Sequence, residues 1–259
     1  MTAITTGSSI GPTTTLGPSR IVSVLKLQFV NRWTTVWIPL LILGAILVMN
    51  IAIWALILAN LDASADRAEV QEGFQYSGAS GYIFVYMLVV AVQAMNLTFP
   101  FALGFGSTRR DYYLGSSLAF VLYSVGYGAI LTLLSYLEEW TGGWFLGGRM
   151  FTAVYFGNGP WFERLFVFGG GVLFFFMIGV AFGTVYVRWK ARGLTAAFVL
   201  LAILLVGAAA LVSVTNGWEA LGAWFAQAQA VGTVAALLIP TALFGIAGFF
   251  ILRRATPKS

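Results

Sequence analysis

The sequence predicts an all-α membrane protein with six transmembrane helices and both termini in the cytoplasm. The first observation is composition. Of the 259 residues, 59% are hydrophobic and 9% are charged, which excludes a soluble globular domain. The second observation is a series of long apolar runs, and the third is the way in which charge alternates between the loops that join them.

Six apolar runs account for the expected transmembrane helices. Each holds about 20 residues or slightly more, which as α-helix covers the roughly 30 Å hydrocarbon core of a bilayer. The runs are Val36–Ala59, Tyr82–Phe105, Leu118–Leu137, Leu165–Val187, Leu194–Val214 and Val231–Leu252. Because the loops between them are short, we expect one membrane domain over residues 36–254.

Charged residues predict the orientation. One set of connections carries most of the basic residues: Arg20, Lys26, Arg32, Arg109, Arg110, Arg188, Lys190, Arg192, Arg253, Arg254 and Lys258. The opposite set carries Arg67, Arg149 and Arg164 together with every acidic residue except Asp111. Positively charged loops stay inside, so both ends should be cytoplasmic in a multi-pass protein of the cell membrane, as in a bacterial inner membrane. The net charge of +5 then indicates attraction to anionic lipid and implies no nucleic-acid partner.

The N-terminal region divides into two parts. Residues 1–17 are rich in Thr, Ser, Gly and Pro and predict a disordered cytoplasmic tail, and residues 255–259 form a second short tail. Residues 18–35 predict a helix that lies in the membrane interface, because Ile21, Leu25 and Phe29 recur at helical spacing. Arg32 interrupts the apolar face, so a simple cytoplasmic extension of the first span is the alternative.

Three segments are expected on the outer side. Residues 61–80 are polar and acidic and predict a loop. Residues 141–161 combine aromatic residues with glycines, which fits either an aromatic belt at headgroup level or a short segment that re-enters the membrane. Residues 215–230 predict a short outer helix. Its large apolar residues share one arc of a helical wheel: Trp218, Leu221, Trp224 and Phe225.

Absent residue types exclude several kinds of chemistry. The chain has no cysteine and no histidine, so it offers no thiolate nucleophile, imidazole base or histidine-ligated metal. No P-loop sequence is present, so this chain does not bind ATP in that way. We therefore expect no catalytic residue, no metal site and no cofactor in this chain, and we expect that it is not an enzyme.

Polar residues within the expected spans are few. Asn50, Gln93 and Asn96 either form hydrogen bonds between helices or line a substrate path. Charged residues stand only at the ends of the spans, which disfavours a transporter coupled to ions or protons. Gly179 and Gly183 form a GxxxG pair that permits close helix packing.

The most specific string lies between the second and third spans and runs from Gly106 to Gly115. Thr108 is followed three residues later by Asp111, which has the form of a capping box and predicts a helix that begins at Thr108. That helix would carry a compact basic and aromatic surface just beneath the membrane: Arg109, Arg110, Tyr112 and Tyr113. The alternative is that the two arginines only determine topology, which leaves the tyrosines and glycines unexplained.

This string resembles a stretch found in the permease subunits of type-2 ABC exporters, particularly actinobacterial ones. In that family a pattern G-x-[ST]-R-R-x-[FY]-x-x-G follows the second span, and Arg188–Arg192 after the fourth span is also similar. The resemblance implies that residues 18–33 form a connecting helix. It also implies a coupling helix that docks on a separate ATPase through Thr108, Arg109, Arg110, Asp111, Tyr112 and Tyr113.

The function expected from the resemblance is ATP-driven export of an amphipathic, drug-like or lipid-like molecule. ATP and Mg would be bound by the ATPase partner, and a second permease copy or a paralogue would complete the transporter within the lipid. Two alternatives stay open. A self-contained secondary transporter or channel would transport without ATP or a partner, and a non-transport membrane protein, such as an immunity or assembly factor, would show no flux.

Overall fold

A computed structural model describes residues 18–61 and 64–254, so the tails expected at 1–17 and 255–259 lie outside the described residues. Within the described ranges the chain forms helices and loops and contains no strand. Five helices are long and apolar enough to cross a membrane. The expected class, an all-α protein embedded in a membrane, is therefore confirmed.

The helices follow one another with short connections. They are α1 (Pro18–Gln28), α2 (Ile38–Ala59), α3 (Ser64–Gly73), α4 (Tyr82–Gln93), α5 (Phe99–Gly104), α6 (Arg109–Trp140), α7 (Trp161–Val214) and α8 (Trp218–Arg253). Short helical turns lie between them: η1 (Trp33–Trp37), η2 (Phe74–Tyr76), η3 (Ala79–Gly81), η4 (Ala94–Thr98), η5 (Gly143–Gly147) and η6 (Val154–Phe156).

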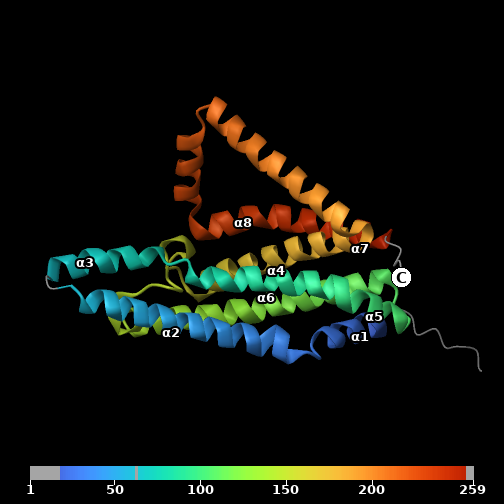
Figure 1. Cartoon of the computed structure of the whole chain (residues 1–259), viewed down its shortest axis with the longest axis horizontal. Coiled ribbons are helices and arrows are strands. Elements are labelled where there is room, and N and C mark those ends of the chain that lie inside the picture. The colour runs from blue at the N-terminus through green and yellow to red at the C-terminus, as the bar shows by residue number, and fades with distance from the viewer. Residues whose placement is uncertain (1–17, 62–63, 255–259) are drawn as a thin grey trace, which may run out of the picture.

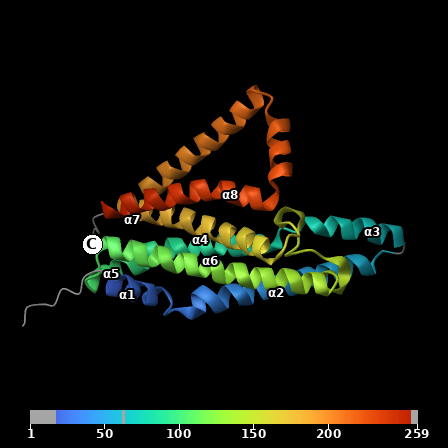
Figure 2. The same cartoon turned by 180° about the vertical axis from the view of Figure 1, so that it is seen from behind.

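The long helices lie side by side as a bundle with two distinct ends. Figures 1 and 2 show α1, α5, the start of α6 and the end of α8 together at one end, which we call the basic end. The middle of α7, with Arg188–Arg192, also lies there. The opposite end holds α3 and the loop over residues 141–160, and we call it the acidic end.

The fourth and fifth expected spans are two parts of one helical element. α7 continues through Lys190, where the backbone turns at φ 57° and ψ −150°, so the expected loop is replaced by a single residue. α8 changes direction in the same way at Gln229, with φ 52° and ψ −163°. Between these two points the chain leaves the bundle and returns to it, and Figure 1 shows the resulting triangle. No residue in the most apolar stretch of α7 is buried.

The first half of α7 packs closely against α4. A Cβ atom at Gly179 would lie 2.3 Å from the Leu88 carbonyl oxygen, and one at Gly183 would lie 2.7 Å from the Met95 Cβ. Only a residue without a side chain allows this approach. The GxxxG pair is therefore a contact within the chain.

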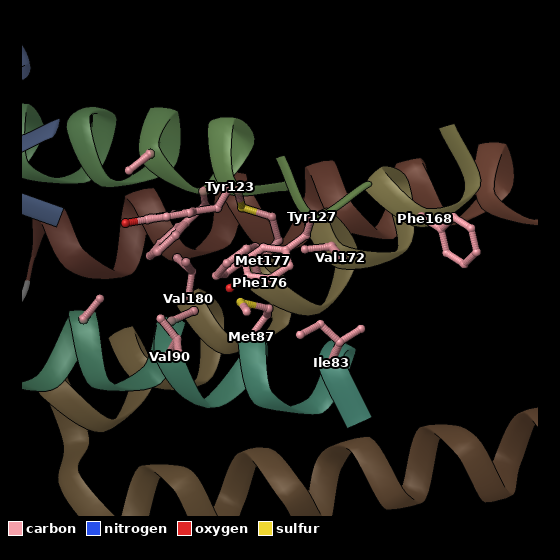
Figure 3. Close-up of a cluster of buried hydrophobic side chains, with 14 of the residues drawn as sticks. Ile83, Met87, Val90, Tyr123, Tyr127, Phe168, Val172, Phe176, Met177 and Val180 are labelled. Carbon is pink, nitrogen blue, oxygen red and sulfur yellow. The ribbon is translucent and has the colours of Figure 1, made fainter. Parts of the chain in front are cut away.

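Apolar side chains of α4, α6 and α7 fill the centre of the bundle (Figure 3). The rings of Phe120 and Phe176 stack with centroids 4.8 Å apart. The residues labelled in the close-up are Ile83, Met87 and Val90 of α4, Tyr123 and Tyr127 of α6, and Phe168, Val172, Phe176, Met177 and Val180 of α7.

Three expected boundaries differ from the structure. The loop expected over residues 61–80 contains α3, a helix over Ser64–Gly73. The interfacial helix expected over residues 18–35 ends at Gln28, and helical structure resumes at Trp33. The outer helix expected over residues 215–230 is the first part of α8, which begins at Trp218 and changes direction at Gln229.

Candidate functional site

The turn between α5 and α6 is built by a glycine and a helix cap. Gly106 has φ +80°, a conformation that glycine adopts without strain. The Asp111 backbone N–H donates to the Thr108 hydroxyl oxygen at 3.1 Å, so Thr108 caps α6 as its sequence predicts. The helix itself begins at Arg109 and runs to Trp140, so the expected short helix is the first part of a long one.

The two arginines stand at the surface of the basic end. Arg110 is exposed and Arg109 is half-buried. An Arg109 guanidinium N–H donates to the Arg253 carbonyl oxygen at 3.2 Å, which joins the start of α6 to the end of α8. One accessible turn thus carries four residues of the string: Thr108, Arg109, Arg110 and Asp111.

Both tyrosines of the string are buried, and they are not part of the expected exposed surface. Tyr112 is 0% and Tyr113 is 5% exposed. The Tyr112 hydroxyl donates to the Ala94 carbonyl oxygen at 2.6 Å, and Tyr113 donates to the Gly245 carbonyl oxygen in α8. Tyr113 lies one helical turn after Arg109 and, like Arg109, faces α8, while Tyr112 faces η4. The tyrosines tie α6 to η4 and α8.

The second glycine of the string is required by the packing of α1. A Cβ atom at Gly115 would lie 2.7 Å from the Val24 Cβ and 2.9 Å from the Ile21 carbonyl oxygen. Val24 is 1% exposed, so α1 rests directly on α6 at this point. Four residues of the string therefore have a structural role: Gly106, Thr108, Tyr112 and Gly115.

A buried amide strengthens the contact between α1 and α6. The Gln28 side-chain amide donates to the Ser116 hydroxyl at 2.9 Å and to the Tyr112 hydroxyl at 3.3 Å. Gln28 is 9% exposed and Ser116 is 0% exposed. Hydrogen bonds of this kind are the usual way to satisfy polar groups inside an apolar bundle. Gln28 did not stand out in the sequence because it lies at the end of the expected stripe.

Three more tyrosines hold the segment between α1 and α2. Tyr86 donates to the Thr34 carbonyl oxygen at 2.8 Å, and Tyr127 donates to the Thr35 carbonyl oxygen at 2.6 Å. Tyr123 donates to the Gln28 carbonyl oxygen at 3.0 Å. The spacing of Tyr123 and Tyr127, one helical turn apart, is the sequence signal that could have identified this contact. The entry of the chain into α2 is therefore fixed by α4 and α6.

The three amide residues expected to share a role are not brought together. The Asn50 side chain donates to the Ile46 carbonyl oxygen of its own helix at 2.9 Å, so it joins no second helix. Gln93 is exposed on α4. The side-chain oxygen of Asn96, on η4, is buried without a hydrogen-bond partner in the described residues.

The acidic end contains a buried carboxylate that the sequence did not single out. Glu138 is 0% exposed at the end of α6. It accepts hydrogen bonds from the backbone N–H groups of Met150, Phe151 and Thr152 at 2.8–3.2 Å. It also accepts from the Trp144 indole N–H at 2.7 Å and from the Thr152 hydroxyl at 2.6 Å. One carboxylate thus organises most of the loop over residues 144–152.

An ion pair beside Glu138 fixes the start of α7. Arg164 is 4% exposed and donates to a Glu139 carboxylate oxygen at 2.7 Å. The same guanidinium donates to the Gly159 carbonyl oxygen at 2.8 Å and to the Ser135 hydroxyl at 3.1 Å, and it lies 4.4 Å from the centre of the Tyr136 ring. Both acids are therefore engaged in structural contacts.

Aromatic residues at the acidic end fall into two groups. Trp140, Phe145 and Trp161 are more than half exposed and stand at the rim. Phe151 is 1% exposed and packs under the loop. The loop therefore folds back on the end of the bundle, with some of its aromatic residues available to a lipid interface.

Comparisons of the chain with family models, with curated proteins and with solved structures give no match.

Proposed function

We propose that this chain is the permease subunit of an ATP-driven ABC exporter that moves an amphipathic, drug-like or lipid-like molecule out of the cell. In this proposal the chain crosses the cell membrane, a bacterial inner membrane, six times, with both termini in the cytoplasm. A separate ATPase binds ATP and Mg, and a second permease copy or a paralogue completes the transporter.

The observation that carries the proposal is the position of residues 108–111, which we call the arginine turn. Arg110 is exposed at the end of α6, and Arg109 beside it is hydrogen-bonded to the end of α8. Two residues further on, Tyr112 joins α6 to η4 and to Gln28 of α1. A force applied to this turn would therefore act on several elements at once, which is what a switch between two packings requires.

Charge supports the orientation and the number of spans. The arginine turn lies at the end of the bundle where Arg188–Arg192 and the end of α8 also lie (Figure 1). Basic residues mark the cytoplasmic side, where an ATPase would be. The two halves of α7, which meet at Lys190 at this end, would then cross the membrane in opposite directions and supply the fourth and fifth spans.

The uncharged interior supports an amphipathic cargo. The side chains that fill the bundle centre are apolar or aromatic, and the buried charges Glu138 and Arg164 lie at the acidic end in structural hydrogen bonds. Ion-coupled transporters place such charges within their spans. This arrangement favours transport driven by a partner.

Co-purification and charge reversal test the proposal. The tagged chain should co-purify with a nucleotide-binding subunit from its native membrane. The variant Arg110→Glu, which changes an exposed side chain, should reduce ATP-dependent transport by about tenfold or more if a docking contact of about 1.4 kcal/mol or more is lost. Arg192→Glu is the matched control, because it makes the same charge change at the same end but outside the turn.

The outcomes separate the three classes of function. Full transport by the Arg110→Glu variant at normal expression would contradict the coupling role. Transport by the purified chain alone, without ATP, would favour a self-contained transporter or channel. The absence of both a nucleotide-binding partner and any flux would favour a non-transport membrane protein.

A further inference from the structure

A second site lies at the acidic end, away from the arginine turn. A cavity of about 760 Å³ opens between α4, the loop around η6, α7 and α8. This volume is within the range of roughly 300–1,000 Å³ that is typical of small-molecule sites. Figure 1 shows that the first part of α8 returns to the bundle beside this loop. The turn at Gln229 thus forms one edge of the cavity.

The walls of the cavity are mainly aromatic. Phe84 of α4 stands at the centre, with its ring 6.2 Å from that of Phe156 and 5.6 Å from that of Phe175. Three further residues complete the aromatic lining: Tyr155, Phe174 and Phe225. Gly171 faces Phe84, and a Cβ atom there would lie 3.0 Å from the ring, so this glycine leaves room beside it. Such walls bind hydrocarbon well.

The cavity is polar at one end only. Asn158 and Gln229 line it at the acidic end, and both residues are exposed. Thr233 and Leu237 follow on the same face of α8, so the cavity extends about 12 Å along that helix, two turns deeper into the bundle. The Thr233 hydroxyl donates to the Gln229 carbonyl oxygen at 2.6 Å and is thereby satisfied within the helix. The two amides therefore lie at the acidic end of the cavity, and Leu237 lies two helical turns from Gln229.

No Asp, Glu, Lys or Arg is among the residues that line this cavity. An uncharged head could form hydrogen bonds with the two amides, whereas this lining offers a charged head no counter-charge. We propose that this cavity binds one acyl chain beneath an uncharged, hydrogen-bonding head, with the head between Asn158 and Gln229 and the chain against Phe84 and Leu237.

Two sources share this chemistry: a single-chain amphiphile and a diacyl membrane lipid with an uncharged head. Photolabelling of the purified full chain in nanodiscs distinguishes them. The probes are a monoacylglycerol and a diacylglycerol, each with a diazirine in its acyl chain. We expect at least one probe to label peptides from residues 154–175 and 225–237, and the probe that labels them identifies the source. Labelling that falls only elsewhere, for both probes, would overturn the proposal.

Head-group charge is a second test. A fatty acid and an alkyl trimethylammonium that carry the same diazirine chain should label the cavity peptides about tenfold less than the uncharged probe, because the lining offers neither head a counter-charge. Equal labelling by the charged probes would overturn the assignment of an uncharged head.

Cavity-filling variants complete the experiment. Two variants place a larger side chain in the cavity from α8 and should reduce labelling about tenfold: Ala226→Trp and Thr233→Phe. The matched controls, Ala223→Trp and Ala235→Phe, change residues of the same helix that do not line the cavity. Unchanged labelling in both cavity variants would contradict the site. These assays need no ATPase or nucleotide, so their result is independent of the proposed export function.

Discussion

Tyr112 shows how one side chain links three parts of the molecule. Its hydroxyl donates to the Ala94 carbonyl oxygen in η4, and it accepts a hydrogen bond from Gln28 of α1, while its ring belongs to α6. Because the Tyr112 side chain is 0% exposed, both hydrogen bonds are shielded from water. The residue that the family resemblance suggested as a docking contact is therefore an internal anchor for the turn that precedes it.

The variant Tyr112→Phe should lower the free energy of unfolding by about 1–3 kcal/mol, because it removes two buried hydrogen bonds, one to the Ala94 carbonyl and one from the Gln28 amide. Equilibrium unfolding in mixed micelles measures this change. Tyr76→Phe is the matched control, since Tyr76 is 67% exposed and should change stability little. Equal stability of the two variants would contradict the anchoring role.

Glu138 has a comparable role at the acidic end, where five donor groups converge on one carboxylate. Glu138→Gln keeps a single acceptor oxygen and turns an N–H₂ group toward N–H donors. We expect the free energy of unfolding to fall by about 3 kcal/mol and proteolytic cleavage within residues 141–156 to become faster. Glu219→Gln, an exposed change on α8, should leave the cleavage rate unaltered. Cleavage at the wild-type rate in Glu138→Gln would refute this role.

At the scale of elements, the apolar runs located the helices well, because hydrocarbon thickness imposes a minimum length on each. The runs at 36–59, 82–105 and 118–137 all lie largely within helices of the structure. The start of α6 was also predictable, since Thr108 and Asp111 have a recognisable capping pattern. The length of an apolar run and a helix cap each depend on residues that are close in sequence, so both can be predicted from the sequence.

The turn at Lys190 within α7 was not predictable in the same way. A loop was expected over Arg188–Arg192 because charged residues end an apolar run, yet the chain reverses at Lys190 alone. Turn signals such as glycine or proline are absent at this residue, and the conformation depends on tertiary packing. The role of Gln28 was hidden for a related reason, since its partners Tyr112 and Ser116 are more than 80 residues away in sequence.

The variant Lys190→Gly should raise the free energy of unfolding by about 1–2 kcal/mol. Lys190 adopts φ 57° and ψ −150°, a conformation that is costly for any residue except glycine. The neighbouring Ala191→Gly is the matched control and should lower stability by about 0.5–1 kcal/mol, because Ala191 is helical and exposed. Destabilisation by both changes would show that no backbone strain is relieved at Lys190.

For the whole molecule, the structure describes five helices that could cross a membrane, while charge predicts six spans. The difference is α7, whose 54 residues are too many for one crossing. Its second half is apolar throughout and unburied within the chain, as expected for a segment surrounded by lipid or by another subunit.

Cysteine labelling decides between five and six spans, because the chain contains no native cysteine. Ala220→Cys should react with a membrane-impermeant maleimide in intact cells. Ala191→Cys, another exposed alanine, should react only after the cells are permeabilised. This result would place the two ends of the second half of α7 on opposite sides of the membrane. Reaction of both positions from the same side would contradict the six-span topology.

The loop that folds around Glu138 has a consequence for where this protein can work. Many secreted or surface-exposed loops rely on disulfide bonds, which form only where oxidants are present. Here a carboxylate supplied by the end of a helix takes that place, and no cysteine exists to be oxidised or reduced. The face opposite the arginine turn should therefore reach its final shape without any folding catalyst for thiols, and should keep that shape in reducing surroundings.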